Sequence, residues 1–201
     1  MKKDFYNIYI VGVGGQGVLT IADIITTVAA KLDIPVNYFP TKGMAQRGGF
    51  VKAQLRLGRE VVGPDISEQG ADLIISMELS ETLKAVKYLK EGGDYLIYGS
   101  KWEPAAVMLG NAPYPEKEII INEIKAVKGN AIFLDDKLRP EYNGKLVREN
   151  LFVLGGIMQS TSLRKIFSVD DVIEGIKEKW PKGVEENIYT FNEGLKSEIE
   201  M

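Results

Sequence analysis

Residues 5–18 read FYNIYIVGVGGQGV, and this stretch decides the fold. Residues 5–11 form a nearly continuous run of aromatic and β-branched side chains, which is typical of a strand that is covered on both faces. Gly12, Gly14 and Gly17 follow at once in the pattern G-x-G-x-x-G. Glycine permits a tight turn and lets the backbone come close to a neighbouring group. The stretch therefore predicts a strand, a glycine-rich turn and the start of a helix, as at the beginning of a doubly wound α/β sheet.

Helical and strand-like patterns alternate after this turn. Apolar residues spaced three and four apart predict a helix, and they are Val18, Ile21, Ile25, Val28 and Leu32. Residues 34–39 predict a second strand. Residues 50–57 alternate apolar and polar side chains, which indicates a half-exposed strand that is antiparallel or lies at an edge of the sheet. Gly58 and Arg59 then fit the two-residue turn of a hairpin, with residues 60–62 as its return.

The rest of the chain continues the alternation and ends in helices. Further strands are expected at residues 73–77, 95–98 and 131–134, with helices at 79–89 and 116–127 and a proline-containing loop at 101–115. Helical spacing then dominates at residues 150–163, 169–180 and 184–199. The patterns predict one α/β domain over residues 1–201. We expect a three-layer, mostly parallel, Rossmann-like sheet with helices on both faces and a helical C-terminal arm.

The composition narrows the chemistry that this chain can carry out. Among its 201 residues there is no cysteine and no histidine. This excludes a thiolate metal site, a cysteine-ligated iron–sulfur cluster and a histidine general base. We expect no metal site, and we assign no catalytic residue to this chain. The formal net charge of −3 argues against a nucleic-acid partner. Because no apolar run approaches the ~18 residues of a membrane-spanning helix, we expect a cytoplasmic protein without membrane contact.

The glycine turn has the form of an anion-binding site. A helix that begins directly after such a turn presents free backbone N–H groups and partial positive charge to a phosphate. The alternative is a tight turn that binds nothing. A dinucleotide site also needs an acidic residue near the end of the second strand, and residues 37–43, NYFPTKG, contain none. Lys42 and Arg47 could instead hold a 2′-phosphate, so a free-standing NAD(P)-binding dehydrogenase domain is kept as an alternative.

A second glycine-rich segment, PTKGMAQRGG at residues 40–49, lies between two predicted strands. It combines two cations and an amide with three glycines: Lys42, Arg47, Gln46, Gly43, Gly48 and Gly49. A guanidinium group can form two parallel hydrogen bonds to a phosphate, and glycines let the backbone approach it. The segment therefore suggests either a ligand contact or a loop that docks a partner chain.

The two glycine motifs together carry a family resemblance. GVGGQGVLT at residues 12–20, followed by TKGMAQRGGFVKAQLRLG at 41–58, resembles the gamma-type domain of the 2-oxoacid:ferredoxin oxidoreductases. The form GMAQRGG most resembles the beta subunit of indolepyruvate ferredoxin oxidoreductase. The likeness continues through residues 71–93 and through NLFVLGGIM at 150–158, so it covers nearly the whole chain.

This resemblance implies a subunit of a larger enzyme that is inactive alone. Such enzymes decarboxylate a 2-oxoacid on thiamine diphosphate, pass electrons through iron–sulfur clusters to ferredoxin and release an acyl-CoA. The thiamine and cluster sites lie on partner subunits, and this chain is expected to complete the coenzyme A cleft. The residues expected to contact coenzyme A are Gly12, Gly14, Gly15, Gln16, Gly17, Lys42, Gly43, Gln46, Arg47, Gly48 and Gly49.

Several alternatives stay open within and beyond the family. The 2-oxoacid is expected to be indolepyruvate, with pyruvate, 2-oxoglutarate or 2-oxoisovalerate as alternatives. A stand-alone regulatory protein that binds coenzyme A or a nucleotide is a further possibility.

Two polar residues lie at expected element boundaries. Glu78 follows a predicted strand, and we expect it to cap or solvate the next helix rather than to act as a site carboxylate. Asn150 precedes an apolar helix and is expected to be its N-cap.

Overall fold

The computed structural model describes residues 5–42, 48–58 and 63–201, and it arranges them around one six-stranded sheet. The strand order is β2-β3-β1-β4-β5-β6. The strands are β1 (Tyr6–Val13), β2 (Val36–Lys42), β3 (Phe50–Leu57), β4 (Ala71–Ser76), β5 (Leu89–Tyr98) and β6 (Asn130–Leu134). β1, β4, β5 and β6 are parallel neighbours, whereas β3 is antiparallel to both β1 and β2. The prediction of a mostly parallel α/β sheet is confirmed.

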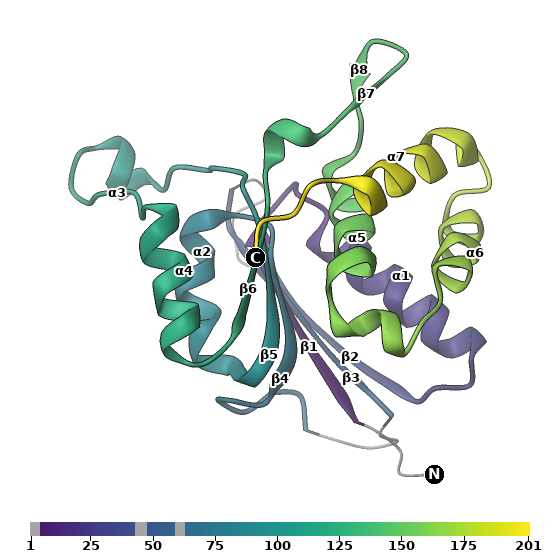
Figure 1. Ribbon diagram of the computed structural model, residues 1–201, viewed down its shortest axis with the longest axis horizontal. Helices are drawn as coiled ribbons and strands as arrows, with labels where there is room; N and C mark the ends of the chain where they lie inside the picture. Colours follow the sequence, from purple (N-terminus) through teal and green to yellow (C-terminus); the bar gives the residue numbers. More distant parts are fainter. Residues whose placement is uncertain (1–4, 43–47, 59–62) are drawn as a thin grey trace.

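Helices cover both faces of this sheet (Figure 1). On one face lie α1 (Val18–Lys31), α5 (Glu149–Ser160), α6 (Val169–Lys179) and α7 (Val184–Lys196), and on the other α2 (Leu79–Ala85) and α4 (Lys117–Ala126). The alternation within β1 explains this arrangement. Ile8 and Ile10 belong to the hydrophobic cluster beneath α1 and α5, while Tyr9 and Val11 belong to the cluster beneath α2 and α4. Both faces of the strand are therefore buried, as its apolar run predicts.

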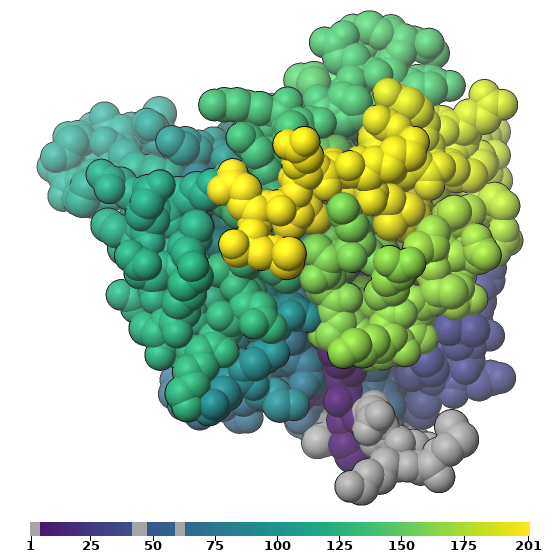
Figure 2. All heavy atoms as spheres, in the orientation of Figure 1, coloured from purple at the N-terminus to yellow at the C-terminus, as the bar shows by residue number. Residues whose placement is uncertain are grey.

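The C-terminal helices pack back onto the sheet rather than projecting from it. α5 and α7 cross so closely that a Cβ atom at Gly155 would lie 2.2 Å from the Phe191 carbonyl oxygen. A Cβ atom at Gly194 would lie 2.0 Å from the Phe152 carbonyl oxygen, so both helices need glycine at the crossing. The end of the chain, yellow in Figure 2, then lies across β6, where Phe133 N donates to Glu200 O at 2.8 Å. This contact covers part of a sheet edge that would otherwise expose unpaired backbone groups.

The expected antiparallel strand at 50–57 is confirmed as β3, but β3 lies inside the sheet, between β2 and β1. Of the hairpin expected at 58–62, Gly58 is described, with a φ of 81°, but residues 59–62 lie outside the described residues. The expected loop at 101–115 contains the short helix α3 (Ala105–Met108). The described residues also contain three 3₁₀ turns, namely η1 (Val86–Tyr88), η2 (Asp136–Leu138) and η3 (Ser162–Lys165).

A small hairpin precedes α5 and was not predicted. Its strands are β7 (Glu141–Tyr142) and β8 (Lys145–Leu146), and it projects beyond the end of the main sheet (Figure 1). Asn143 and Gly144 form its turn with φ values of 51° and 75°. Asn-Gly is the dipeptide that favours this turn, so the sequence did hold a signal for it. Within the described ranges, no helix is long and apolar enough to cross a membrane.

Candidate functional site

The two glycine motifs meet at the carboxyl end of the parallel strands. Gly14 N donates a hydrogen bond to Gly49 O at 2.8 Å, and Gly48 N donates to Gly14 O at 3.3 Å. These bonds extend the β1–β3 ladder, whose last pair is Val13 with Phe50. Since β3 is antiparallel to β1, the segment that enters β3 must begin where β1 ends. The two turns therefore form one continuous backbone surface.

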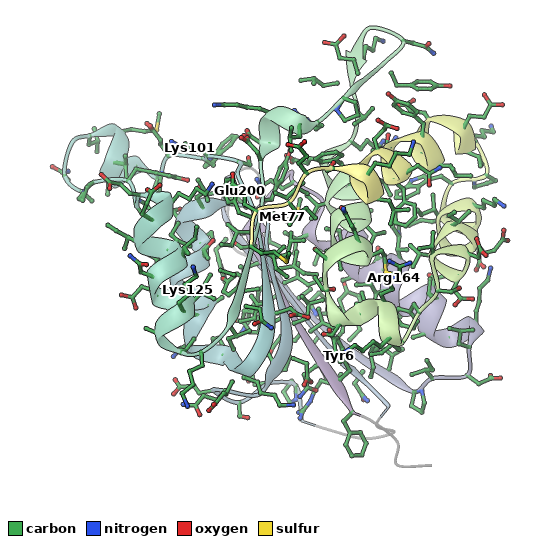
Figure 3. The ribbon with its side chains drawn as sticks, in the orientation of Figure 1. Tyr6, Met77, Lys101, Lys125, Arg164 and Glu200 are labelled. Carbon is green, nitrogen blue, oxygen red and sulfur yellow. The ribbon has the colours of Figure 1, made fainter. Side chains whose placement is uncertain are left out.

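Gln16 braces this surface from inside. Its side chain is buried, and its Oε1 accepts from Val13 N at 3.0 Å. Its Nε2 donates to Met77 O at 2.7 Å and to Ser100 Oγ at 3.2 Å. Met77 lies where the strands end (Figure 3), so one amide ties the glycine turn to the ends of β4 and β5. These bonds engage both the oxygen and the nitrogen of its amide. The expected contact of Gln16 with coenzyme A stays a prediction.

Gly17 shapes the start of α1. It stands at the N-cap position in the left-handed conformation, with φ at 78° and no side-chain cap. A Cβ atom there would lie 2.4 Å from Asn150 Nδ2. The first turn of α1 contains no acidic residue. The first N–H groups of a helix have no partner inside it, and they attract an anion when nothing else caps them.

Gly15 keeps the approach to this helix end open. Its φ is 111°, and no described heavy atom beyond Gly15 and its two chain neighbours lies within 4 Å of the place where its Cβ atom would be. Gly12 behaves differently, because a Cβ atom there would lie 2.9 Å from Met77 Cβ. Gly12 therefore serves the packing of the turn, whereas Gly15 leaves space above it.

Glu78 is a buried cap, which confirms the expected capping role and rules out solvation of its side chain. Its Oε2 accepts from Glu81 N at 3.1 Å, as an N-cap of α2. Its Oε1 accepts from Trp102 N at 2.9 Å and from the Tyr114 hydroxyl. Burial, and next the hydrogen bond to Glu78, raise the pKa of that hydroxyl above its usual range. The carboxylate thus anchors the loop that carries α3.

Trp102 connects this anchor to the second glycine motif. A Cβ atom at Gly48, whose φ is 69°, would lie 2.7 Å from Trp102 Nε1. The indole is half exposed and packs against the Gly48 backbone. No sequence pattern pointed to this role, because Trp102 lies in a proline-containing loop without periodicity.

The prediction that Asn150 is the N-cap of α5 is wrong. Arg148 holds the cap position without a side-chain cap bond, and Asn150 is the second residue of the helix. Its Oδ1 accepts from Leu151 N at 2.9 Å, and its side chain packs against Gly17. The apolar run that follows Asn150 starts at Leu151, two residues after the helix itself, which explains the error.

Part of the predicted site cannot be placed. Gly43, Gln46 and Arg47 lie outside the described residues. The backbone of Lys42 ends β2, opposite Val51, but its side chain is not described. The expected cation contacts of this segment therefore stay predictions. The described residues contain no cluster of acidic side chains that could hold a metal ion.

The family model for pyruvate ferredoxin/flavodoxin oxidoreductases matches residues 7–197 of this chain. The chain belongs to this family. As a member, it is a subunit of a 2-oxoacid:ferredoxin oxidoreductase. The resemblance to the gamma-type domain of these enzymes is confirmed. The match spans both glycine motifs and the C-terminal helices. This membership favours the oxidoreductase subunit over the alternative of a free-standing NAD(P)-binding dehydrogenase domain.

Its relatives include two subunits of indolepyruvate oxidoreductase. The IorB subunit of Archaeoglobus fulgidus is 37% identical over 86% of this chain and 84% of its own length. The IorB subunit of Pyrococcus horikoshii is 34% identical over 98% of this chain and 97% of its own length.

Solved structures show the same fold. The pyruvate oxidoreductase subunit PORC of Thermotoga maritima matches with a TM-score of 0.71 at 17% identity, over 99% of this chain and 100% of that one. A 2-oxoglutarate:ferredoxin oxidoreductase from Magnetococcus marinus matches with a TM-score of 0.65 at 17% identity. There the match covers 97% of this chain but 31% of that chain. The same fold therefore also occurs as one part of a longer polypeptide.

Proposed function

We propose that this chain is the subunit of an indolepyruvate:ferredoxin oxidoreductase that completes the coenzyme A cleft. The observation that carries the proposal is the pairing of Gly14 with Gly48 and Gly49 in a family member. Identity also favours indolepyruvate over the other 2-oxoacids. The chain is 34–37% identical to the first two IorB subunits but 27% identical to the pyruvate/ketoisovalerate gamma subunit of Thermococcus kodakarensis.

The division of labour follows from composition. A chain without cysteine or histidine offers no usual ligand for an iron–sulfur cluster. We therefore assign the thiamine diphosphate and the clusters to partner subunits, which also hand electrons to ferredoxin. This chain contributes binding and orientation of coenzyme A.

The backbone supports a phosphate contact. Gly15 leaves space above the turn, and the uncapped end of α1 directs N–H groups and partial positive charge toward that space. Lys42 is the last residue of β2, and Arg47 directly precedes in sequence Gly48, which bonds to this turn. Their positive charges would attract the phosphate groups of coenzyme A, and the guanidinium group of Arg47 would donate two parallel hydrogen bonds to one of them.

The test is an assay of the assembled enzyme. The chain is co-purified with its thiamine- and cluster-binding partner, and coenzyme A-dependent reduction of ferredoxin is measured with indolepyruvate, pyruvate, 2-oxoglutarate and 2-oxoisovalerate. We expect the highest kcat/KM with indolepyruvate and no activity from this chain alone. A preference for another 2-oxoacid contradicts the substrate assignment, and turnover by the isolated chain contradicts the division of labour.

The coenzyme A contact is tested in the same enzyme. Arg47→Ala should raise the KM for coenzyme A and leave the KM for the 2-oxoacid unchanged, because a phosphate-directed cation is lost. Arg164→Ala is the matched control, since Arg164 is an exposed arginine of η3. An unchanged KM for coenzyme A in Arg47→Ala would assign that residue to partner docking.

A further inference from the structure

A cavity of about 350 Å³ opens beside the glycine turn, and its far wall comes from Arg139 and residues 147–150. Gly15, Gly17 and Thr20 form the near wall at the start of α1. Arg139 and Arg148 are among the residues of the far wall, on either side of the β7–β8 hairpin. The volume is within the range of small-ligand sites.

Arg139 has unused hydrogen-bonding capacity. Its Nη1 lies 3.7 Å from Glu149 Oε2, which is an ion pair but too long for a hydrogen bond. Its Nε is buried without a hydrogen-bond partner among the described residues. Buried donors of this kind are rare in folded proteins, and the described residues supply no acceptor for this one.

Arg148 is held by an aromatic ring rather than by a carboxylate. Its guanidinium carbon lies 5.4 Å from the centre of the Trp180 ring. Within the described part of the chain no hydrogen bond or ion pair engages this side chain. A guanidinium that rests on an indole keeps its edge donors available to a ligand.

Two helices begin at this cavity. α1 starts after Gly17 and α5 starts after Arg148, and neither has a side-chain N-cap bond. The positive ends of both helix dipoles therefore add to the field of the two arginines. Glu149 is the opposing charge on the wall, and its Oε2 lies 3.7 Å from Arg139 Nη1.

We propose that this cavity is a binding site for a diphosphate group, with Arg139 and Arg148 as its side-chain ligands. Two guanidinium forks and two uncapped helix ends suit two linked phosphates better than a single carboxylate. Coenzyme A and the nicotinamide dinucleotides share such a group. The choice of coenzyme A among them rests on the proposed function, whereas the diphosphate chemistry does not.

The site is tested with inorganic pyrophosphate and the purified full chain by titration calorimetry. The wild-type chain should bind pyrophosphate, and Arg148→Gln should weaken binding about tenfold or more, because a charge-assisted hydrogen bond is lost. Arg139→Gln should act in the same direction. Glu149→Gln should strengthen binding, since it removes the opposing charge.

The matched control is Arg164→Gln. Arg164 is an exposed arginine of η3 (labelled in Figure 3), and the neighbouring Ser162 bonds Tyr6 at the start of β1, the far end of the sheet. This variant should bind pyrophosphate as the wild type does. Arg148 is exposed, so its replacement should cost no more stability than its contact with the Trp180 ring supplies, and should keep the test valid if Arg139→Gln fails to fold.

Competition identifies the source of the diphosphate. Coenzyme A, NAD⁺ and NADP⁺ are each titrated against bound pyrophosphate, and we expect displacement by coenzyme A alone. Displacement by a nicotinamide dinucleotide instead would keep the diphosphate site and contradict the proposed function. Lack of pyrophosphate binding by the wild type, or equal binding by Arg148→Gln and Arg164→Gln, overturns the site itself.

Discussion

Replacement of Gln16 by alanine should destabilise the whole domain. The Gln16 amide is the only side chain within the described residues whose bonds join the glycine turn to the ends of two other strands. It is buried, with 7% of its surface exposed. Gln16→Ala removes all three hydrogen bonds and leaves Val13 N–H and Met77 C=O without their partner.

The size of the effect follows from those two backbone groups. A buried donor or acceptor that loses its partner costs about 1–3 kcal/mol. Entry of a water molecule into the vacated space would recover part of this for a polar site. We therefore expect a loss of about 2–4 kcal/mol in the free energy of unfolding, a large share of the stability of a typical domain.

Urea unfolding followed by far-ultraviolet circular dichroism measures this loss. Gln159→Ala is the matched control, because Gln159 is an exposed glutamine of α5, and it should change the free energy of unfolding by less than about 0.5 kcal/mol. Gln16→Glu should be at least as destabilising as Gln16→Ala, since it puts a carboxylate oxygen near Met77 O, 2.7 Å from the present nitrogen. If Gln16→Ala is as stable as Gln159→Ala, the Gln16 amide does not stabilise the domain by joining these strand ends.

Three further predictions concern neighbouring positions. Gly17→Ala should destabilise the domain more than Gly183→Ala. Both glycines are helix N-caps with similar φ values, 78° and 74°, but only at Gly17 would the added Cβ atom meet a neighbouring side chain. Equal urea midpoints of the two variants would contradict this. Tyr114→Phe should lower the free energy of unfolding by about 1.5–3 kcal/mol, as a hydrogen bond to the buried Glu78 carboxylate is lost, and a change below about 0.5 kcal/mol would show that the carboxylate does not need it. Burial raises the pKa of the Glu149 carboxyl in the folded chain, so the wild type loses stability as pH rises through that pKa. Glu149→Gln should therefore melt at a higher temperature than the wild type near neutral pH, and the difference should shrink in acid. A lower melting temperature of the variant near neutral pH would contradict this sign.

Most of the fold could be predicted because its strands and helices have clear periodicity. The place of β3 could not, since one polar face is expected both for an edge strand and for an interior antiparallel strand. In the structure that polar face is covered by a loop. Gln54 Nε2 donates to Asp65 Oδ1 at 2.9 Å, and Gln54 Oε1 accepts from Ile66 N at 2.7 Å. Such coverage depends on tertiary contacts that periodicity does not record.

The site could be predicted in part. Glycines in a strand–turn–helix context signal an open turn locally, and Gly15 and Gly17 have the backbone conformations that this requires. The joining of Gly14 to Gly49 depends on strand direction and register, which the local pattern leaves open. Arg139 and Arg148 lie far along the chain from the glycine turn, and only the return of α5 to α1 brings them to the cavity.

Hydrogen exchange in the assembled enzyme tests the central claim most directly, namely that the joined glycine turns seat coenzyme A. Backbone exchange is followed by mass spectrometry with and without coenzyme A. We predict slower exchange in the peptides that contain Gly15 to Leu19 and Gly48 to Gly49, and no change in the peptide that contains η3. Unchanged exchange at both turns, with coenzyme A bound and protection elsewhere on the enzyme, would contradict the account.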